Sequence, residues 1–76
     1  MNYEYGEPYL EITFHDDRVV RIKKSAITDM REEKVKENDE TKYQVEVFIN
    51  RGGTYISYTF FGRMEEFDKR CKTVYI

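Results

Sequence analysis

The sequence predicts a mostly β protein of the α+β class: a curled antiparallel sheet or small barrel of four to five strands with one C-terminal helix. Three observations predict this fold. Residues 42–61 have the pattern of one long β-hairpin, residues 9–24 have that of a second, and apolar residues take a helical spacing after residue 62. Because 76 residues make one small domain, we expect a curled sheet that encloses one core and hides its edges.

The segment 42–61 is predicted to turn at Gly52-Gly53. β-Branched and aromatic residues dominate both of its arms, and two glycines supply the positive φ angles of a tight hairpin turn. This register places apolar residues together on one face, in the pairs Ile49–Ile56, Val47–Tyr58 and Val45–Phe60. The other face pairs Asn50 with Tyr55, Phe48 with Ser57 and Glu46 with Thr59. A one-residue slip would mix polar and apolar groups on both faces, so we reject it.

Residues 9–24 are predicted to form the other hairpin. Leu10, Ile12 and Phe14 alternate with polar residues, and the same alternation resumes at residues 19–23. A three-residue loop, Asp16-Asp17-Arg18, aligns apolar partners. It sets Phe14 opposite Val20, Ile12 opposite Ile22 and Glu11 opposite Lys23.

Residues 25–41 allow two interpretations. Ser25 is a suitable helix cap, and a helix would place Ala26, Ile27, Met30 and Lys34 on one side, a thin stripe for burial. The alternative is a bend at residues 25–27 followed by a polar strand near residues 28–34. We favour the strand because it gives a continuous meander with short loops. In either case residues 36–41 are predicted to be a solvated loop.

Residues 62–72 are predicted to be the helix. Met64, Phe67 and Cys71 have the spacing of one helical face. Acidic residues lie near the start and basic residues near the end, which suits the helix dipole. Residues 74–76 are expected to add a short final strand or to pack as a tail.

The chain is expected to be a single domain, residues 1–76, with residues 1–8 as an extended or mobile arm. The formal net charge of −2 argues against non-specific nucleic-acid binding. The acidic segment 1–17 and the basic segment 18–24 are expected to meet across a hairpin. A lone cysteine, Cys71, allows no internal disulfide. With no apolar run long enough for a membrane, these features indicate a cytoplasmic protein.

Catalytic and metal-binding constellations are weak in this sequence. His15, Asp16 and Asp17 are adjacent, but consecutive side chains in a tight loop diverge, and Asp is a common turn residue. Cys71 is expected on a buried helix face, where a thiol is usually inert packing. We therefore expect no enzymatic activity, no cofactor and no metal site.

The surplus of aromatic residues favours a binding function. On the predicted register Phe48, Tyr55 and Phe61 face away from the core, so they are either covered by the helix or the N-terminal arm or form a contact surface. The leading hypothesis is a non-enzymatic protein-interaction module, such as a small inhibitor, adaptor, regulatory subunit or homodimer, that binds through this aromatic sheet face. The alternative is an anionic small ligand, such as a nucleotide, bound at the turn. That site would consist of Arg51, Gly52, Gly53 and Thr54.

Overall fold

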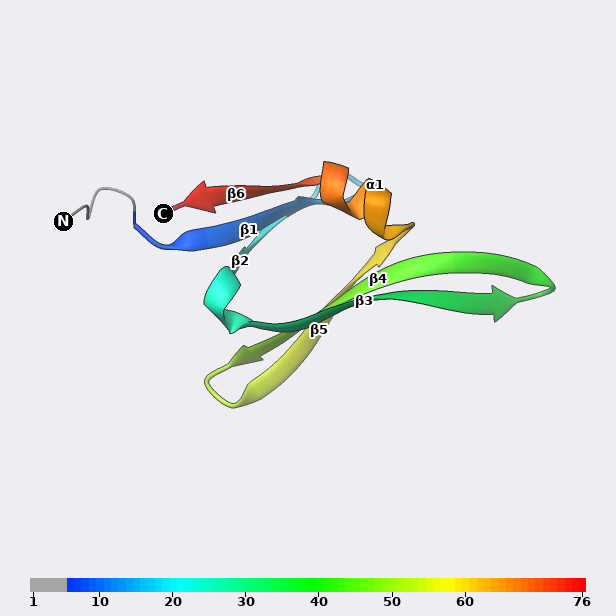
Figure 1. The fold of residues 1–76 in the computed structure, drawn as a ribbon, viewed down its shortest axis with the longest axis horizontal. Coiled ribbons are helices and arrows are strands. Elements are labelled where there is room, and N and C mark those ends of the chain that lie inside the picture. Colours follow the sequence, from blue (N-terminus) through cyan, green and yellow to red (C-terminus); the bar gives the residue numbers. More distant parts are fainter. Residues whose placement is uncertain (1–5) are drawn as a thin grey trace.

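The computed structural model describes residues 6–76. Its strands are β1 (Pro8–Thr13), β2 (Val19–Lys23), β3 (Ile27–Glu37), β4 (Glu40–Arg51), β5 (Thr54–Phe61) and β6 (Cys71–Tyr75). A 3-10 turn (Lys24–Ala26) precedes β3, and the short helix α1 (Met64–Lys69) precedes β6. The strands form two three-stranded antiparallel sheets, ordered β2-β1-β6 and β3-β4-β5. The two sheets form two layers (Figure 1).

The predicted class is correct in outline, because the protein is mostly β and antiparallel with a C-terminal helix. The finer architecture differs from the prediction. Residues 6–76 contain six strands rather than four to five, and these form two open sheets rather than one curled sheet or barrel. The difference arises because β6 pairs with β1 from the far end of the chain. This pairing completes a second sheet around β1.

The long hairpin has the predicted register throughout. Val47 lies opposite Tyr58 and Phe48 opposite Ser57. Gly52 and Gly53 both have positive φ, 56° and 92°. The Asn50 side chain accepts a hydrogen bond from the Gly53 N–H at 2.9 Å and fastens the turn.

The first hairpin is shifted by two residues from the predicted register. Ile12, not Phe14, lies opposite Val20, and Glu11 lies opposite Arg21 rather than Lys23. The turn is moved one residue earlier than predicted, because the Phe14 N–H donates to the Arg18 carbonyl at 2.9 Å and leaves residues 15–17 as the loop. A shift of two leaves every side chain on its predicted face, and Phe14 is buried in the core.

Acidic and basic residues meet across this hairpin, as predicted. Arg21 Nε lies 2.8 Å from Glu11 Oε2, and Lys23 Nζ lies 2.7 Å from Glu7 Oε2. Lys72 of β6 approaches the same Glu11 carboxylate at 3.4 Å. The hydrogen bond from Arg21 is the main cause that lowers the pKa of Glu11 below its usual value of 4.5.

The preference for a third strand after residue 27 is confirmed, whereas the predicted loop at residues 36–41 is wrong. β3 continues to Glu37 and β4 begins at Glu40, so only Asn38 and Asp39 form the turn. Both turn residues have positive φ, 51° and 64°. Asn and Asp tolerate this left-handed conformation better than other non-glycine residues, so a two-residue turn replaces the loop.

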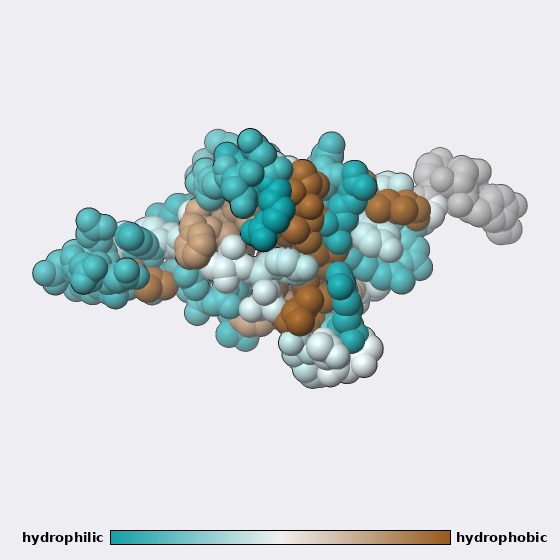
Figure 2. Space-filling model, turned by 180° about the vertical axis from the view of Figure 1, so that it is seen from behind, coloured by the Kyte–Doolittle hydropathy of each residue, from teal (hydrophilic) through white to brown (hydrophobic). Residues whose placement is uncertain are grey.

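The outer end of the β3–β4 hairpin, residues 34–43, projects from the body of the molecule (Figure 1). We call it the projecting arm. It contributes to an elongated shape of 55 × 27 × 18 Å. Figure 2 shows this end as mostly hydrophilic, while hydrophobic residues gather in a band across the middle of the same view. The arm therefore adds strand length without adding core.

The C-terminal helix is shorter than predicted. α1 ends at Lys69, and residues 71–75 form β6. Cys71 consequently lies on a strand opposite Ile12 and not on a buried helix face. Pairing with β1 supplies backbone hydrogen bonds to a segment rich in β-formers, Thr-Val-Tyr, and outweighs continuation of the helix. No helix in residues 6–76 is long and apolar enough to span a membrane.

The termini of the described chain lie together. Glu7 and Ile76 exchange two backbone hydrogen bonds of 3.1 Å, and Pro8 begins β1. Gly6 has a φ of 61°, and a Cβ there would lie against the Ile76 carbonyl. Of the predicted arm 1–8, residues 1–5 lie outside the described residues.

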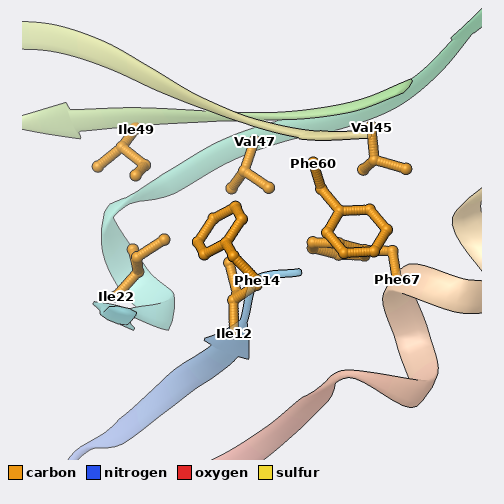
Figure 3. Packing of buried hydrophobic residues seen from close by; sticks show 8 residues of the cluster. All are labelled: Ile12, Phe14, Ile22, Val45, Val47, Ile49, Phe60 and Phe67. Carbon is orange, nitrogen blue, oxygen red and sulfur yellow. The ribbon is translucent and has the colours of Figure 1, made fainter. Parts of the chain in front are cut away.

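The core lies between the two sheets and is closed at one end by α1. Figure 3 shows side chains of β4 pointing toward those of β1 and β2, with the rings of Phe14, Phe60 and Phe67 beside them. Phe60 contacts Phe67 of α1 edge-on with ring centroids 5.4 Å apart, and Phe14 with centroids 6.3 Å apart. The buried set is Ile12, Phe14, Ile22, Val45, Val47, Ile49, Phe60 and Phe67.

Glu32 of β3 fastens α1 to the second sheet. Its Oε2 accepts hydrogen bonds from the Met64 N–H at 2.7 Å and from Arg63 Nε at 3.1 Å. Arg63 in turn lies over the Tyr43 ring, 3.8 Å from its centroid. The Met64 N–H, and then Arg63, lower the pKa of Glu32 below 4.5.

Replacing Val47 by alanine should lower the free energy of unfolding by about 2–3 kcal/mol, because this side chain is fully buried and its loss leaves a cavity. The measurement is urea denaturation followed by circular dichroism. The same change at Val35, on the projecting arm, is the matched control and should cost less than about 1 kcal/mol. Equal losses at the two sites would contradict the assignment of the core.

Changing Glu32 to Gln should lower the melting temperature at pH 7, and the difference from the wild type should shrink in acid. The folded pKa of Glu32 is lowered, so its charge stabilises the fold above its unfolded pKa. This stabilisation disappears as the pH falls from about 4.5 through the lower folded value. Thermal melts from pH 7 to pH 3 measure the effect, with Glu40→Gln as control. A pH-independent difference would contradict an electrostatic origin.

Candidate interaction surface

The candidate surface is the outer face of the β3-β4-β5 sheet, which we call the outer face. Side chains alternate along each strand, and Val45, Val47 and Ile49 point into the core. The residues between them therefore face outward, together with their cross-strand neighbours. The outer face comprises Asp29, Arg31 and Glu33 of β3, Gln44, Glu46, Phe48 and Asn50 of β4, and Tyr55, Ser57, Thr59 and Phe61 of β5.

The three predicted contact residues differ in exposure. The side chains of Tyr55 and Phe61 are 74% and 69% exposed. Phe48 is half-buried, and the Arg31 guanidinium lies 4.9 Å from its ring centroid. Neither α1 nor any other part of residues 6–76 covers Tyr55 and Phe61, so both aromatic rings are available for contact.

The structure brings Phe48 and Tyr55 together but separates Phe61 from them. Phe48 and Tyr55 line one shallow hollow near the Gly52-Gly53 turn, together with Ser57. Phe61 lies at the other end of β5, opposite Gln44. It lines a different hollow with Phe14, His15, Asp16, Arg18 and Thr59.

His15, considered above for metal binding, contacts the end of β5. Its ring stacks on Phe60 with centroids 4.8 Å apart. Its Nε2 lies 2.7 Å from the Phe61 carbonyl oxygen, and it donates to this acceptor. The contact joins residues far apart in sequence, and neither hydrophobic periodicity nor turn chemistry indicated it.

The carboxylates of Glu33 and Glu46 lie close together near the centre of the outer face. The hydrogen bond with Glu33, and then burial, raises the pKa of Glu46 above 4.5. The Glu33 Oε1 atom is buried without a hydrogen-bond partner. Beside them Arg31 Nε donates to Asp29 Oδ2 at 2.7 Å, and this bond lowers the pKa of Asp29. The centre of the surface is therefore polar, and the aromatic rings lie at its two ends.

The predicted anion site at Arg51, Gly52, Gly53 and Thr54 forms the tip of the β4–β5 hairpin. Arg51 is exposed and Thr54 lies opposite it. The Gly53 N–H is already donated to Asn50 Oδ1. One of the two glycine donors in that prediction is thus engaged within the turn.

Cys71 lies half-buried on β6 and packs against the core. Burial, and to a smaller extent the negative charge of Asp68, raises the pKa of its thiol to about 11. A thiol needs its deprotonated form to act as a nucleophile. The environment of Cys71 therefore favours packing over reaction.

Cys71 should react slowly with a thiol reagent in the native protein. At pH 8 a pKa of about 11 leaves only roughly one thousandth of the thiol as thiolate. The native rate should rise about tenfold per pH unit between pH 7 and pH 9, and it should increase sharply in denaturant at constant pH. Stopped-flow labelling with an aromatic disulfide measures both. Rapid labelling of the native protein at pH 7 would contradict the assigned environment.

Comparison with known proteins identifies no relative of the chain. No protein-family model, no curated protein and no solved structure matches the chain. The surface is therefore interpreted from its own geometry: two uncovered aromatic rings, one half-buried ring beneath an arginine, and a polar centre.

Proposed function

We propose that the protein is a non-enzymatic protein-interaction module that binds a protein partner through the outer face. The observation that carries the proposal is the exposure of Tyr55 and Phe61, at 74% and 69%, on an ordered strand of a small domain. Contact with a partner would remove these large aromatic side chains from water, and burial of apolar surface is favourable. The roles that fit are those of a small inhibitor, an adaptor or a regulatory subunit.

The composition of the outer face resembles that of a binding hot spot. Tyr and Arg are enriched at positions that dominate binding energy. Near the turn, Tyr55 and Phe48 line a common hollow and Arg31 covers the Phe48 ring. These side chains project from strands, so a partner would meet a preformed surface and would order few side chains on binding.

Three carboxylates that are ion-paired with arginine support a binding role over a catalytic one. Glu11, Asp29 and Glu32 each accept a hydrogen bond from an arginine, and each has a lowered pKa. A general acid or base needs a pKa near the working pH, whereas these carboxylates are held in their charged form. Their chemistry is that of structural ion pairs.

Tyr55→Ala and Phe61→Ala should each weaken partner binding by about 30-fold or more, equivalent to about 2 kcal/mol. Both rings are exposed, so the melting temperature should change little. The wild-type chain, immobilised, captures a partner from its source cells, and biolayer interferometry with the purified pair measures affinity.

Tyr75→Ala is the matched control, because Tyr75 is 60% exposed on β6 of the other sheet. It should leave affinity unchanged. Equal affinity for all three variants would contradict the outer face as the binding surface. A steep fall in melting temperature for Tyr55→Ala would show instead that this ring supports the fold.

A further inference from the structure

The outward edge of β5 differs in chemistry from the other sheet edges. β5 reads Thr-Tyr-Ile-Ser-Tyr-Thr-Phe-Phe and contains no charged residue, glycine or proline. The other edge strands all carry basic residues, namely Arg21 and Lys23 on β2, Lys34 and Lys36 on β3, and Lys72 on β6. Charged side chains, especially Lys, protect an edge against pairing with another strand. β5 lacks this protection.

The backbone groups that β5 presents at this edge can be assigned. The Gly62 N–H donates to the Tyr43 carbonyl at 2.9 Å, so the ladder with β4 continues past Phe61. Backbone groups point alternately toward and away from the partner strand in an antiparallel pair. Tyr55, Ser57, Thr59 and Phe61 therefore point theirs away from β4, and within residues 6–76 no strand pairs with this side.

His15 limits the free edge at one end. Its Nε2 is hydrogen-bonded to the Phe61 carbonyl oxygen, which is one of the backbone groups that point away from β4. The Gly52-Gly53 turn limits the edge at the other end. Three residues, Tyr55, Ser57 and Thr59, are left with an outward N–H and an outward carbonyl.

We propose that this free edge pairs with β5 of a second copy of the chain, antiparallel about a twofold axis at Ser57. Ser57 then lies opposite Ser57 of the second copy, and Tyr55 lies opposite Thr59 of the second copy. The pairing joins the β3-β4-β5 sheets of both copies into one continuous sheet. It uses the backbone edge and stands independently of the proposed partner binding through the outer face.

The strand is complementary to itself in this register. On the inner face Ile56 meets Tyr58 of the second copy, and both side chains are half-buried in one copy and border its core. No charge is placed opposite a like charge, although each copy has a net charge of −2. This neutrality favours a second copy over a charged partner strand.

The same pairing changes the outer face. In one copy Tyr55 and Phe61 lie at opposite ends of β5. Antiparallel pairing about Ser57 makes Tyr55 a diagonal neighbour of Phe61 from the second copy, within reach for aromatic side chains. The dimer gathers the two exposed rings that the monomer separates.

The strength of the dimer follows from the number of backbone bonds. Three outward residues in each copy give about six hydrogen bonds across the axis, fewer than the roughly ten of a typical stable interface. We therefore expect a dimer that dissociates in the micromolar range. On dilution, the apparent mass of the purified protein should fall from that of a dimer to the monomer mass of 9.3 kDa.

Charge substitution at the axis tests the proposal. The Ser57 side chain is exposed on the outer face, so Ser57→Lys and Ser57→Glu should keep the melting temperature of the wild type. Each variant alone places two like charges together and should be monomeric in sedimentation equilibrium. An equimolar mixture of the two should recover the dimer, because only position 57 faces itself.

Ser57→Pro provides a second variant that does not depend on charge. It removes an N–H that points away from β4, so it spares the ladder within the monomer while blocking the edge. It should also be monomeric.

The proposal is overturned if the wild type stays monomeric at concentrations up to about 1 mM, well above a dissociation constant in the micromolar range. Dimerisation of Ser57→Lys alone, or a Lys/Glu mixture that remains monomeric, would overturn it equally. These readouts need only the purified chain, so failure to find a partner for the outer face leaves them unaffected.

Discussion

The packing of Phe60 against Phe14 and Phe67 is the contact on which the rest of the structure depends. Within residues 6–76 the two sheets share no hydrogen-bonded strand, so contacts of side chains hold them together. Phe60 of β5 meets Phe14, which follows β1, and Phe67 of α1. One buried ring thus joins both sheets and the helix. The covalent connections, the 3-10 turn and the segment that contains α1, only limit how far the sheets can separate (Figure 1).

A core this small also explains what lies outside it. A chain of about this length buries only about 60% of its unfolded surface, and among the described residues eight side chains form the buried cluster. The projecting arm lies beyond that cluster, and Tyr55 and Phe61 stay in water although they belong to the same hairpin as Val47 and Phe60. The exposed aromatic rings and the uncharged edge of β5 coincide on one strand. Both proposed contacts therefore use β5, one through its side chains and the other through its backbone.

The sequence by itself determined the features that depend on neighbouring residues. The register of the long hairpin followed from strict alternation and the Gly52-Gly53 turn, because a one-residue slip would invert both faces. The strand after residue 27 was favoured over a helix because it gives a continuous meander with short loops. The outward direction of Phe48, Tyr55 and Phe61 followed from the same register. In each case the information lies within a few residues of the element that it specifies.

Only the tertiary structure decided the features that depend on distant parts of the chain. Alternation cannot distinguish registers that differ by two, so it could not give the register of the first hairpin. Pairing with β1, far away in sequence, ended the helix before Cys71 and produced a second sheet. The same long-range packing left Tyr55 uncovered and set His15 against the end of β5. Periodicity reports the direction of a side chain, but what covers that side chain depends on which distant segment packs there.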